Sequence, residues 1–225
     1  EMLVEQLATK RLVNDNFVSK DAETVLIPEL VFINDLEANM NYNEKRITQS
    51  MGRKFEVLDG FSEEEVKEML LKALEEDWIG QIATSIDRYI IQTIIDSANN
   101  DIEAVSFRDS INELDKSIDK LGDLNVSIED RNLLVPFNSY IKYNTLPDFG
   151  VGIGKISKIP TKRLTNIPIH FILLDKNIVT CPVNIEVKIT KKENDLLSKN
   201  YTIETIVRYD CFVKHNRRIS CLKNL

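Results

Sequence analysis

The sequence predicts an α+β fold, and three observations support that prediction. Runs rich in β-branched and apolar residues, typical of strands, come first, over 24–33 and 46–58. A long middle stretch then repeats apolar residues every three or four positions, which is the period of a helix. Strand-like runs return at about 167–174, 183–190 and 200–214, and no internal repeat is visible.

Length and composition exclude several protein classes. The 225 residues suit one large domain or two small interleaved ones. No apolar run approaches the ~20 residues of a membrane span, and no signal peptide opens the chain. We therefore expect a soluble, ordered, intracellular protein. Its three cysteines form no C-x-x-C motif, which argues against zinc fingers and thioredoxin chemistry and favours reduced thiols.

The net charge of −7 is unevenly distributed along the chain. Residues 1–60 carry 7 basic and 11 acidic side chains (−4), residues 61–130 carry 6 and 18 (−12), and residues 131–225 carry 16 and 7 (+9). This asymmetry is compatible with nucleic-acid contact, with attraction between like protomers, or simply with solvated surfaces. The basic residues are scattered and no aromatic ladder accompanies them, so sequence-specific recognition of nucleic acid is poorly supported.

The first third of the chain predicts a long hairpin. Residues 24–33 form the first strand, and Pro28 within it indicates an edge position because proline cannot donate to a ladder. Asn and Asp residues over 34–43 predict a turn or loop tip. The run 46–58 is the expected second strand, with Gly52 as a bulge or bend.

The middle of the chain predicts a long helix. Ser62 and Glu65 have the spacing of a capping box at its start. Gly80 interrupts the pattern, so we expect one kinked helix or two abutting helices that end near Ala98. The apolar positions are Val66, Met69, Leu70, Ala73, Leu74, Ile79, Ile82, Ala83, Ile86, Ile90 and Ile94.

Shorter elements follow. Ser106 can cap a second helix that stops at Gly122. Residues 131–135 predict a short buried strand closed by Pro136, and residues 137–146 a short helix.

The last strands predict a second hairpin. The runs 183–190 and 200–209 are joined by a polar stretch over 191–199. Strand-like alternation continues to residue 214, with Asp210 on the polar face.

Candidate chemical motifs do not form a catalytic set. The run Gly150-Val-Gly-Ile-Gly-Lys155 departs from a phosphate-binding loop because Ile156 follows the lysine, and no strand-to-helix transition surrounds it. His170 lies in an apolar strand as a core or interface histidine, and His215 is in no known nucleophile motif.

The remaining candidates also have ordinary structural explanations. The acidic residues from Glu63 to Asp77 suit a helix N-terminus and a solvated face better than a metal site. Trp78 is expected in a core or protomer contact. The sequence therefore predicts no catalytic residues, no cofactor-binding residues, no metal site and no enzyme.

Five segments occur in an informative order. They are ETVLIPEL, which opens the hairpin; FSEEEVKEMLLKALEEDWIGQIATSIDRYIIQTIIDSA, the long helix; INELDKSIDKLGDLNVSIEDRNLLVPFNSYIKY, a helix, strand and proline; GVGIGKISKIPTKRLTNIP, a glycine-containing loop; and ETIVRYDCFVKHNRRISCL, the terminal strands. In this order, and with an N-terminal arm, the chain resembles the major capsid proteins of tailed bacteriophages, with the Hong-Kong-97-type capsid fold. The resemblance covers nearly the whole chain.

The resemblance implies a division into four parts. They are an N-terminal arm (1–20), an extended hairpin (21–60), a peripheral domain with the long helix and a strand pair (61–105 and 183–210), and an axial domain of mixed sheet and helices (106–182 and 211–225). The chain is shorter than most members and begins at Glu1. Removal of a scaffolding or propeptide segment by a maturation protease explains that start, and so does an artificial boundary.

Physical reasoning agrees with self-assembly, because a lone two-stranded hairpin is marginal in water and its edges invite pairing. We expect the hairpin to lap over an adjacent subunit and the arm to tie protomers together. The predicted interface residues are Leu3, Leu7, Phe17, Leu26, Val31, Phe32, Met51, Phe55 and Trp78.

The resemblance implies a structural shell subunit. Many copies would form pentamers and hexamers of an icosahedral phage head that encloses double-stranded DNA, assembled in the host cytoplasm and located in the virion. Portal, scaffold or decoration proteins are potential partners, packaged DNA would be contacted non-specifically, and no membrane is involved. The alternatives are an encapsulin-like nanocompartment shell, which shares the fold, and a small intracellular α+β enzyme or binding domain.

Overall fold

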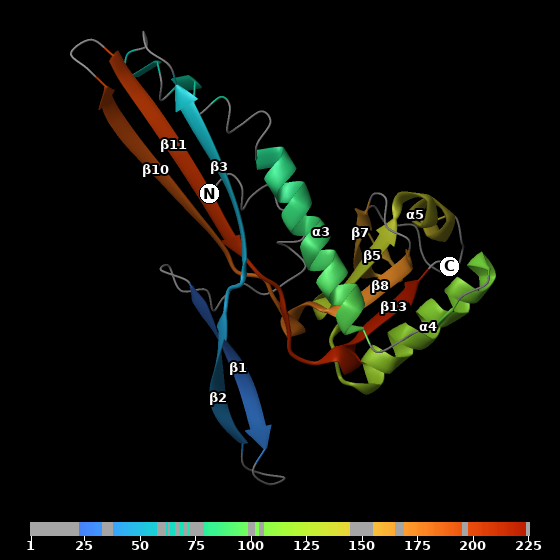
Figure 1. Cartoon of the computed structure of the whole chain (residues 1–225). Coiled ribbons are helices and arrows are strands. Elements are labelled where there is room, and N and C mark those ends of the chain that lie inside the picture. The colour runs from blue at the N-terminus through green and yellow to red at the C-terminus, as the bar shows by residue number, and fades with distance from the viewer. Residues whose placement is uncertain are drawn as a thin grey trace. The chain divides into compact units, whose positions relative to one another are not determined.

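The chain folds as two compact units in the computed structural model (Figure 1). The first unit holds the described residues up to Ile90 together with Cys181–Cys211, and the second holds Ile91–Thr180 and the described residues from Phe212 onward. The structure describes residues 23–32, 38–57, 62, 64–65, 68–69, 72, 79–98, 102–103, 106–144, 155–164, 169–194 and 198–223.

A two-stranded hairpin belongs to the first unit. Strand β1 (Thr24–Phe32) pairs antiparallel with β2 (Ala38–Arg46) along its whole length. Both strands of a two-stranded sheet are edges, so the edge position predicted from Pro28 is confirmed. The predicted partner strand was wrong, however. Residues expected to form the loop tip, over 34–43, supply six of the nine residues of β2, because backbone pairing tolerates their polar side chains.

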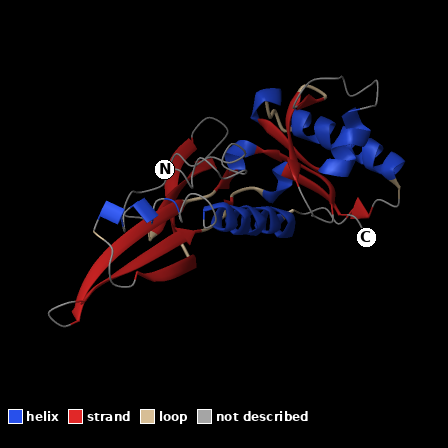
Figure 2. Ribbon diagram, turned by 90° about the horizontal axis from the view of Figure 1, so that it is seen from above, coloured by secondary structure: helices blue, strands red, loops and turns tan. Residues whose placement is uncertain are grey.

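The run predicted as the second hairpin strand joins a different sheet. Strand β3 (Gln49–Val57) pairs with β11 (Ser198–Tyr209), which pairs in turn with β10 (Val183–Asn194). These long antiparallel strands lie side by side in both views (Figures 1 and 2). The hairpin predicted over 183–209 is confirmed.

Gly52 does not form the predicted bulge. It lies in the β3 ladder opposite Ile206, and the register continues through it without a shift. A Cβ at this position would lie 3.3 Å from the Thr205 carbonyl oxygen, so a close backbone approach explains the glycine.

The long helical region is described in part. Helix α3 spans Ile79–Ser97, which confirms the predicted end. The capping box is formed: the Ser62 amide donates to Glu65 Oε2 at 2.7 Å, and the Glu65 amide donates to Ser62 Oγ at 3.3 Å. Most of residues 63–78 lie outside the described residues, so continuity with α3 stays a prediction. The buried residues of α3 are Ile82, Ala83, Ile86, Ile90, Ile91, Ile94 and Ile95.

A six-stranded sheet organises the second unit, in the order β4-β13-β8-β5-β7-β6. The β13–β4 and β5–β7 pairs are parallel, and the other pairs are antiparallel. The strands are β4 (Ile102–Glu103), β5 (Arg131–Pro136), β6 (Lys155–Ile156), β7 (Ile159–Leu164), β8 (Ile169–Asp175) and β13 (Ile219–Lys223).

Two helices contact this sheet. Helix α4 (Phe107–Asp123) contacts β8 and β13, and α5 (Phe137–Asn144) contacts β5 and β7. The Ser106 side chain accepts a hydrogen bond from the Asp109 amide at 3.2 Å, so the predicted cap is confirmed. The buried core of this unit comprises Leu114, Leu121, Val126, Leu133, Val135, Tyr143, Ile156, Ile159, Phe171, Leu173 and Leu222.

Short elements complete the described part of the chain. They are the 3₁₀ turns η3 (Ile128–Asp130), η5 (Lys176–Ile178) and η6 (Asn216–Arg218), and the antiparallel pair β9 (Val179–Thr180) and β12 (Phe212–Val213). The strand predicted to run from 200 to 214 therefore stops at Tyr209 and resumes as β12 in another sheet. Among the described residues, no helix combines the length and the apolar character that a membrane crossing needs.

Candidate functional site

The predicted interface residues are placed unevenly. Leu26 lies in β1 with 50% of its surface exposed, and Met51 is half-buried in β3. The backbones of Val31 and Phe32 (β1) and Phe55 (β3) are described, but their side chains are not. The other predicted interface residues lie outside the described residues: Leu3, Leu7, Phe17 and Trp78.

The β1–β2 hairpin has two different faces. Val25 and Ile27 are buried, at 1% and 6% exposure. Leu26 points to the opposite side, because side chains alternate along a strand. Tyr42 stands directly opposite Pro28 in the register and is 57% exposed. Leu26 and Tyr42 therefore lie on one surface, where Glu44 is also exposed opposite Leu26, and we call it the hairpin face.

A second exposed apolar surface lies on α5 in the other unit. Phe137 and Ile141 are 48% and 49% exposed, and their spacing of four residues puts them on the same side of the helix. The Arg163 guanidinium lies 5.7 Å from the centre of the Phe137 ring and 5.2 Å from that of Tyr140. This cation–π arrangement leaves a mixed aromatic and cationic surface.

A buried carboxylate stabilises the junction of three elements in the first unit. Asp210 is 5% exposed and directly follows β11. It accepts hydrogen bonds from the Thr48 amide and hydroxyl at 2.9 Å each, from the Tyr89 hydroxyl at 2.9 Å, and from the Cys211 amide at 2.8 Å. These bonds join the β2–β3 connection, α3 and the end of β11.

The alternation of side chains along the strand did not predict that Asp210 is buried. It placed this residue on the polar face of a strand that continues to residue 214. The strand ends instead, and the carboxylate turns toward donors that are distant in sequence. A buried carboxylate is tolerated when its oxygens are fully hydrogen-bonded, as they are here. No local sequence signal marks those donors.

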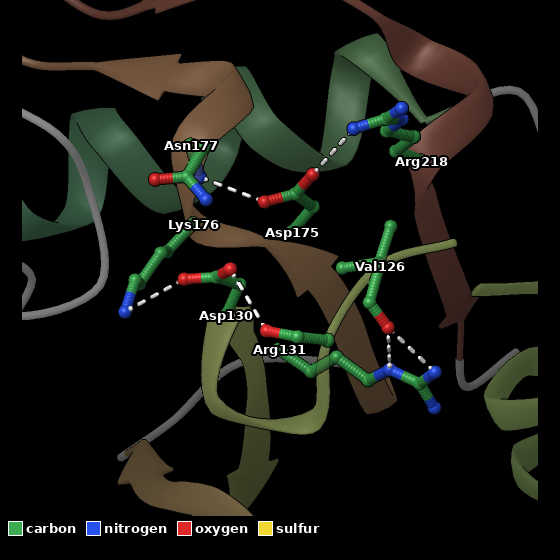
Figure 3. Close-up of polar contacts among 8 residues, drawn as sticks. Val126, Asp130, Arg131, Asp175, Lys176, Asn177 and Arg218 are labelled. Carbon is green, nitrogen blue, oxygen red and sulfur yellow. Dashed lines mark hydrogen bonds and ion pairs between the residues drawn. The ribbon is translucent and has the colours of Figure 1, made fainter. Parts of the chain in front are cut away.

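A polar network connects helix α4 with the sheet of the second unit, and Figure 3 shows the part of it around Arg131 and Asp175. Arg131, 6% exposed, opens β5 and donates to the Val126 carbonyl from Nε at 3.1 Å and from Nη2 at 2.8 Å. Its Nη1 donates to the Ile118 carbonyl at 3.0 Å, within α4. The arginine of the segment SIEDRNLLVP thus fixes the end of the helix against the start of the strand.

Neighbouring charges extend this network. Asp175 is buried and accepts from the Asn177 amide at 2.9 Å and from Arg218 Nη1 at 2.9 Å (Figure 3). Asp130 pairs with Lys176 Nζ at 3.0 Å. A hydrogen bond from Ser127 and then the contact with Lys176 hold the pKa of Asp130 below its usual value. These contacts fix loops of the unit.

The described residues include both histidines and part of the acidic region considered as metal ligands. Within the described part of the chain, no three His, Cys, Asp or Glu side chains come close enough together to hold a metal ion. His170 is half-buried in β8, and burial together with the nearby Lys142 lowers its pKa. His215 is exposed before η6. The loop 150–154, considered above for phosphate binding, lies outside the described residues.

Sequence comparisons identify no family. No family model matches the chain, and no curated protein matches its sequence. The evidence for relationship is therefore structural.

Solved structures match almost the full chain. A chain from Mycobacterium phage Che8 superposes with a TM-score of 0.63 and 14% identity, over 96% of this chain and 90% of that one. A chain from the capsid of the cyanophage P-SCSP1u has a TM-score of 0.61 and 10% identity, over 95% of this chain and 86% of that one. A chain from a virus-like particle of Pyrococcus furiosus has a TM-score of 0.59 and 11% identity, over 99% of this chain and 96% of that one. The chain therefore has the fold of tailed-phage major capsid proteins.

Proposed function

We propose that this chain is a structural shell subunit of a tailed bacteriophage, which assembles with copies of itself into an icosahedral head around double-stranded DNA. The observation that supports this most strongly is the similarity to a capsid chain over 95% of the present chain. Because the similarity extends over both units, it favours a whole shell subunit over a capsid-like domain within a different protein. In this proposal the subunits form pentamers and hexamers.

The hairpin face supports the assembly part of the proposal. A two-stranded sheet is marginal in water unless another surface covers it. Leu26 is 50% exposed and Tyr42 is 57% exposed, while Val25 and Ile27 on the opposite face are buried within the subunit. We assign the cover to an adjacent subunit, and we assign the arm at residues 1–20 and Trp78 to the same contacts. Leu3, Leu7, Phe17, Val31, Phe32, Met51 and Phe55 belong to this proposed interface.

The two compact units support a division into peripheral and axial domains. The chain passes between units at 180/181 and 211/212, close to the predicted limits of the strand pair at 183 and 210. The third boundary lies within α3, after Ile90, rather than near residue 105. We propose the first unit, without its hairpin, as the peripheral domain and the second as the axial domain.

The acidic middle region suggests an inner surface. Glu64, Glu65 and Glu68 are exposed residues in helical conformation. In the proposed shell this acidic segment faces packaged DNA and prevents adhesion by electrostatic repulsion. Tight binding of DNA by isolated subunits, weakened steeply by salt, would contradict this role.

Electron microscopy of the purified, overexpressed chain tests the shell proposal. We expect uniform closed particles that sediment far ahead of a single subunit. A chain that stays monomeric or dimeric at high concentration, in several salts, would contradict the proposal and favour a binding domain or enzyme.

A second candidate is an encapsulin-like compartment that holds protein cargo. The observation that favours it is the match to a virus-like particle, which covers 99% of this chain. Nuclease-protected DNA in particles isolated from the natural source supports a phage head, whereas a co-purified enzyme supports a compartment. Portal and terminase genes beside the gene for this chain would also favour the phage head. A neighbouring peroxidase or ferritin-like gene would favour the compartment.

A further inference from the structure

Two cysteines that are far apart in sequence meet at the base of the β10–β11 hairpin. Cys181 precedes β10 and Cys211 follows β11, and their sulfur atoms lie 3.4 Å apart. The ladder pairs Val183 with Tyr209, and the Asp210 amide donates to the Pro182 carbonyl at 3.2 Å beyond it. Continuing this register by one step places Cys181 directly opposite Cys211.

The backbone at this position suits a disulfide. Residues directly opposite each other in antiparallel strands have Cα atoms roughly 4.5–5.5 Å apart. Disulfides are found at Cα separations of roughly 4.4–6.8 Å. The two sulfur atoms already face each other, so a bond requires only small side-chain rotations.

The surroundings slow the oxidation of this pair. Both cysteines are 6% exposed. Burial raises the pKa of the Cys181 thiol well above its usual value, and Cys211, Asp210 and Asp87 add to this effect. Because the thiolate is the reactive form, both low access and a scarce thiolate slow the reaction.

We infer that Cys181 and Cys211 form a redox modification site, which low-molecular-weight disulfides convert to an intramolecular protein disulfide. One protein thiolate attacks the small disulfide, forms a mixed disulfide and releases one small thiolate. The second protein sulfur then displaces the other small thiolate and closes the protein disulfide. The protein loses two protons and two electrons, and the small disulfide gains them and becomes two thiols.

The bond would lock the base of a long hairpin. It would close a loop over residues 182–210, which contains all of β10 and β11. Cross-linking a loop of this length restricts the unfolded chain and should raise the temperature of unfolding by roughly 5–10 °C. A reducing cytoplasm would preserve the thiols, and an oxidising exterior would favour the disulfide. This consequence holds whether or not the chain forms a shell.

Oxidised glutathione, added to the folded full-length chain at pH 8, tests the inference. After unreacted thiols are alkylated in denaturant, we expect the product to retain one alkylatable cysteine, Cys221. Its mass should be lower by two hydrogens before alkylation, and peptide mapping should recover Cys181 linked to Cys211. The higher unfolding temperature should return to its starting value on reduction.

Matched variants identify the bond. C221A should keep both the linked peptide and the thermal shift, whereas C181A and C211A should lose both. If those two variants fail to fold, the peptide map of the wild-type chain still decides the question. A stable glutathione adduct, a bond to Cys221, or no reaction of the folded chain over days while the denatured chain oxidises would each overturn the inference.

Discussion

The β1–β2 hairpin and the six-stranded sheet use strands of similar length in opposite ways. Strand β5 buries five of its six residues, and β8 buries six of its seven. The hairpin buries Val25 and Ile27 on one face but exposes Leu26 and Tyr42 on the other. The sheet is stabilised by apolar burial within the subunit, whereas the hairpin face leaves apolar area uncovered. One region supports the fold, and the other is suited to association.

The largest effect on stability should come from the sheet core. Phe171 in β8 is 1% exposed and belongs to the core of the second unit. Phe171→Ala should lower the free energy of unfolding by about 3–5 kcal/mol, because a cavity replaces the ring. Denaturant titration at a fixed protein concentration measures this change. A loss below about 1 kcal/mol would contradict the assignment of the core to this sheet.

Breaking the Arg131 network should have the next largest effect. Arg131→Met leaves the Val126 and Ile118 carbonyls without their guanidinium donor, which should cost about 2–3 kcal/mol. Arg208→Met is the matched control, since Arg208 pairs with Glu186 at 3.1 Å in an exposed position. It should change stability by at most about 0.5 kcal/mol. Equal losses for the two variants would show that the network adds no stability.

Alkaline pH should weaken the second unit through Tyr143. Burial raises the pKa of this fully buried residue to about 12. In the unfolded chain a tyrosine ionises near pH 10, so above that pH the unfolded state binds fewer protons than the folded state. The contribution of Tyr143 to the free energy of unfolding is complete below pH ~10. It decreases as pH rises toward 12, by at most about 1.4 kcal/mol per pH unit. Unfolding titrations between pH 9 and 11 test the slope.

Tyr143→Phe is the control for this pH effect. The hydroxyl of Tyr143 donates to Ser110 Oγ at 2.9 Å, so the variant should lose about 1 kcal/mol at neutral pH. Its stability should also fall less steeply above pH 10. A slope identical to that of the wild-type chain would assign the alkaline loss to other groups.

The smallest effect on stability is expected at the hairpin face. Leu26→Ser combined with Tyr42→Ser should change the free energy of unfolding by about 0.5 kcal/mol or less, because both side chains are already exposed. If neighbouring copies cover this face, the same double variant should abolish or strongly reduce particle formation in electron micrographs. Val25→Ser, on the buried face, should instead reduce stability by about 1–3 kcal/mol. Normal particles from the double variant would exclude the hairpin face from the interface.

Local signals predicted the elements whose causes are local. Ser62 and Glu65 form the expected capping box, and Ser106 begins α4 as expected. Strand β5 ends at Pro136 and helix α5 begins at the next residue, near the predicted limits. Caps and apolar periodicity operate within a few residues of each other, so the sequence alone carries that information. The order of these elements was also sufficient to suggest the fold.

Only the tertiary structure decided which strands pair and which distant side chains meet. Strand β3 pairs with β11 instead of β1, although all three runs have strand-like composition. Asp210 lies buried beside Thr48 and Tyr89, and Cys181 meets Cys211 across 30 positions. Backbone hydrogen bonds are the same for every residue pair, so the choice among partner strands depends on packing across the whole unit. Burial of a carboxylate or a thiol likewise depends on donors and neighbours that are distant in sequence.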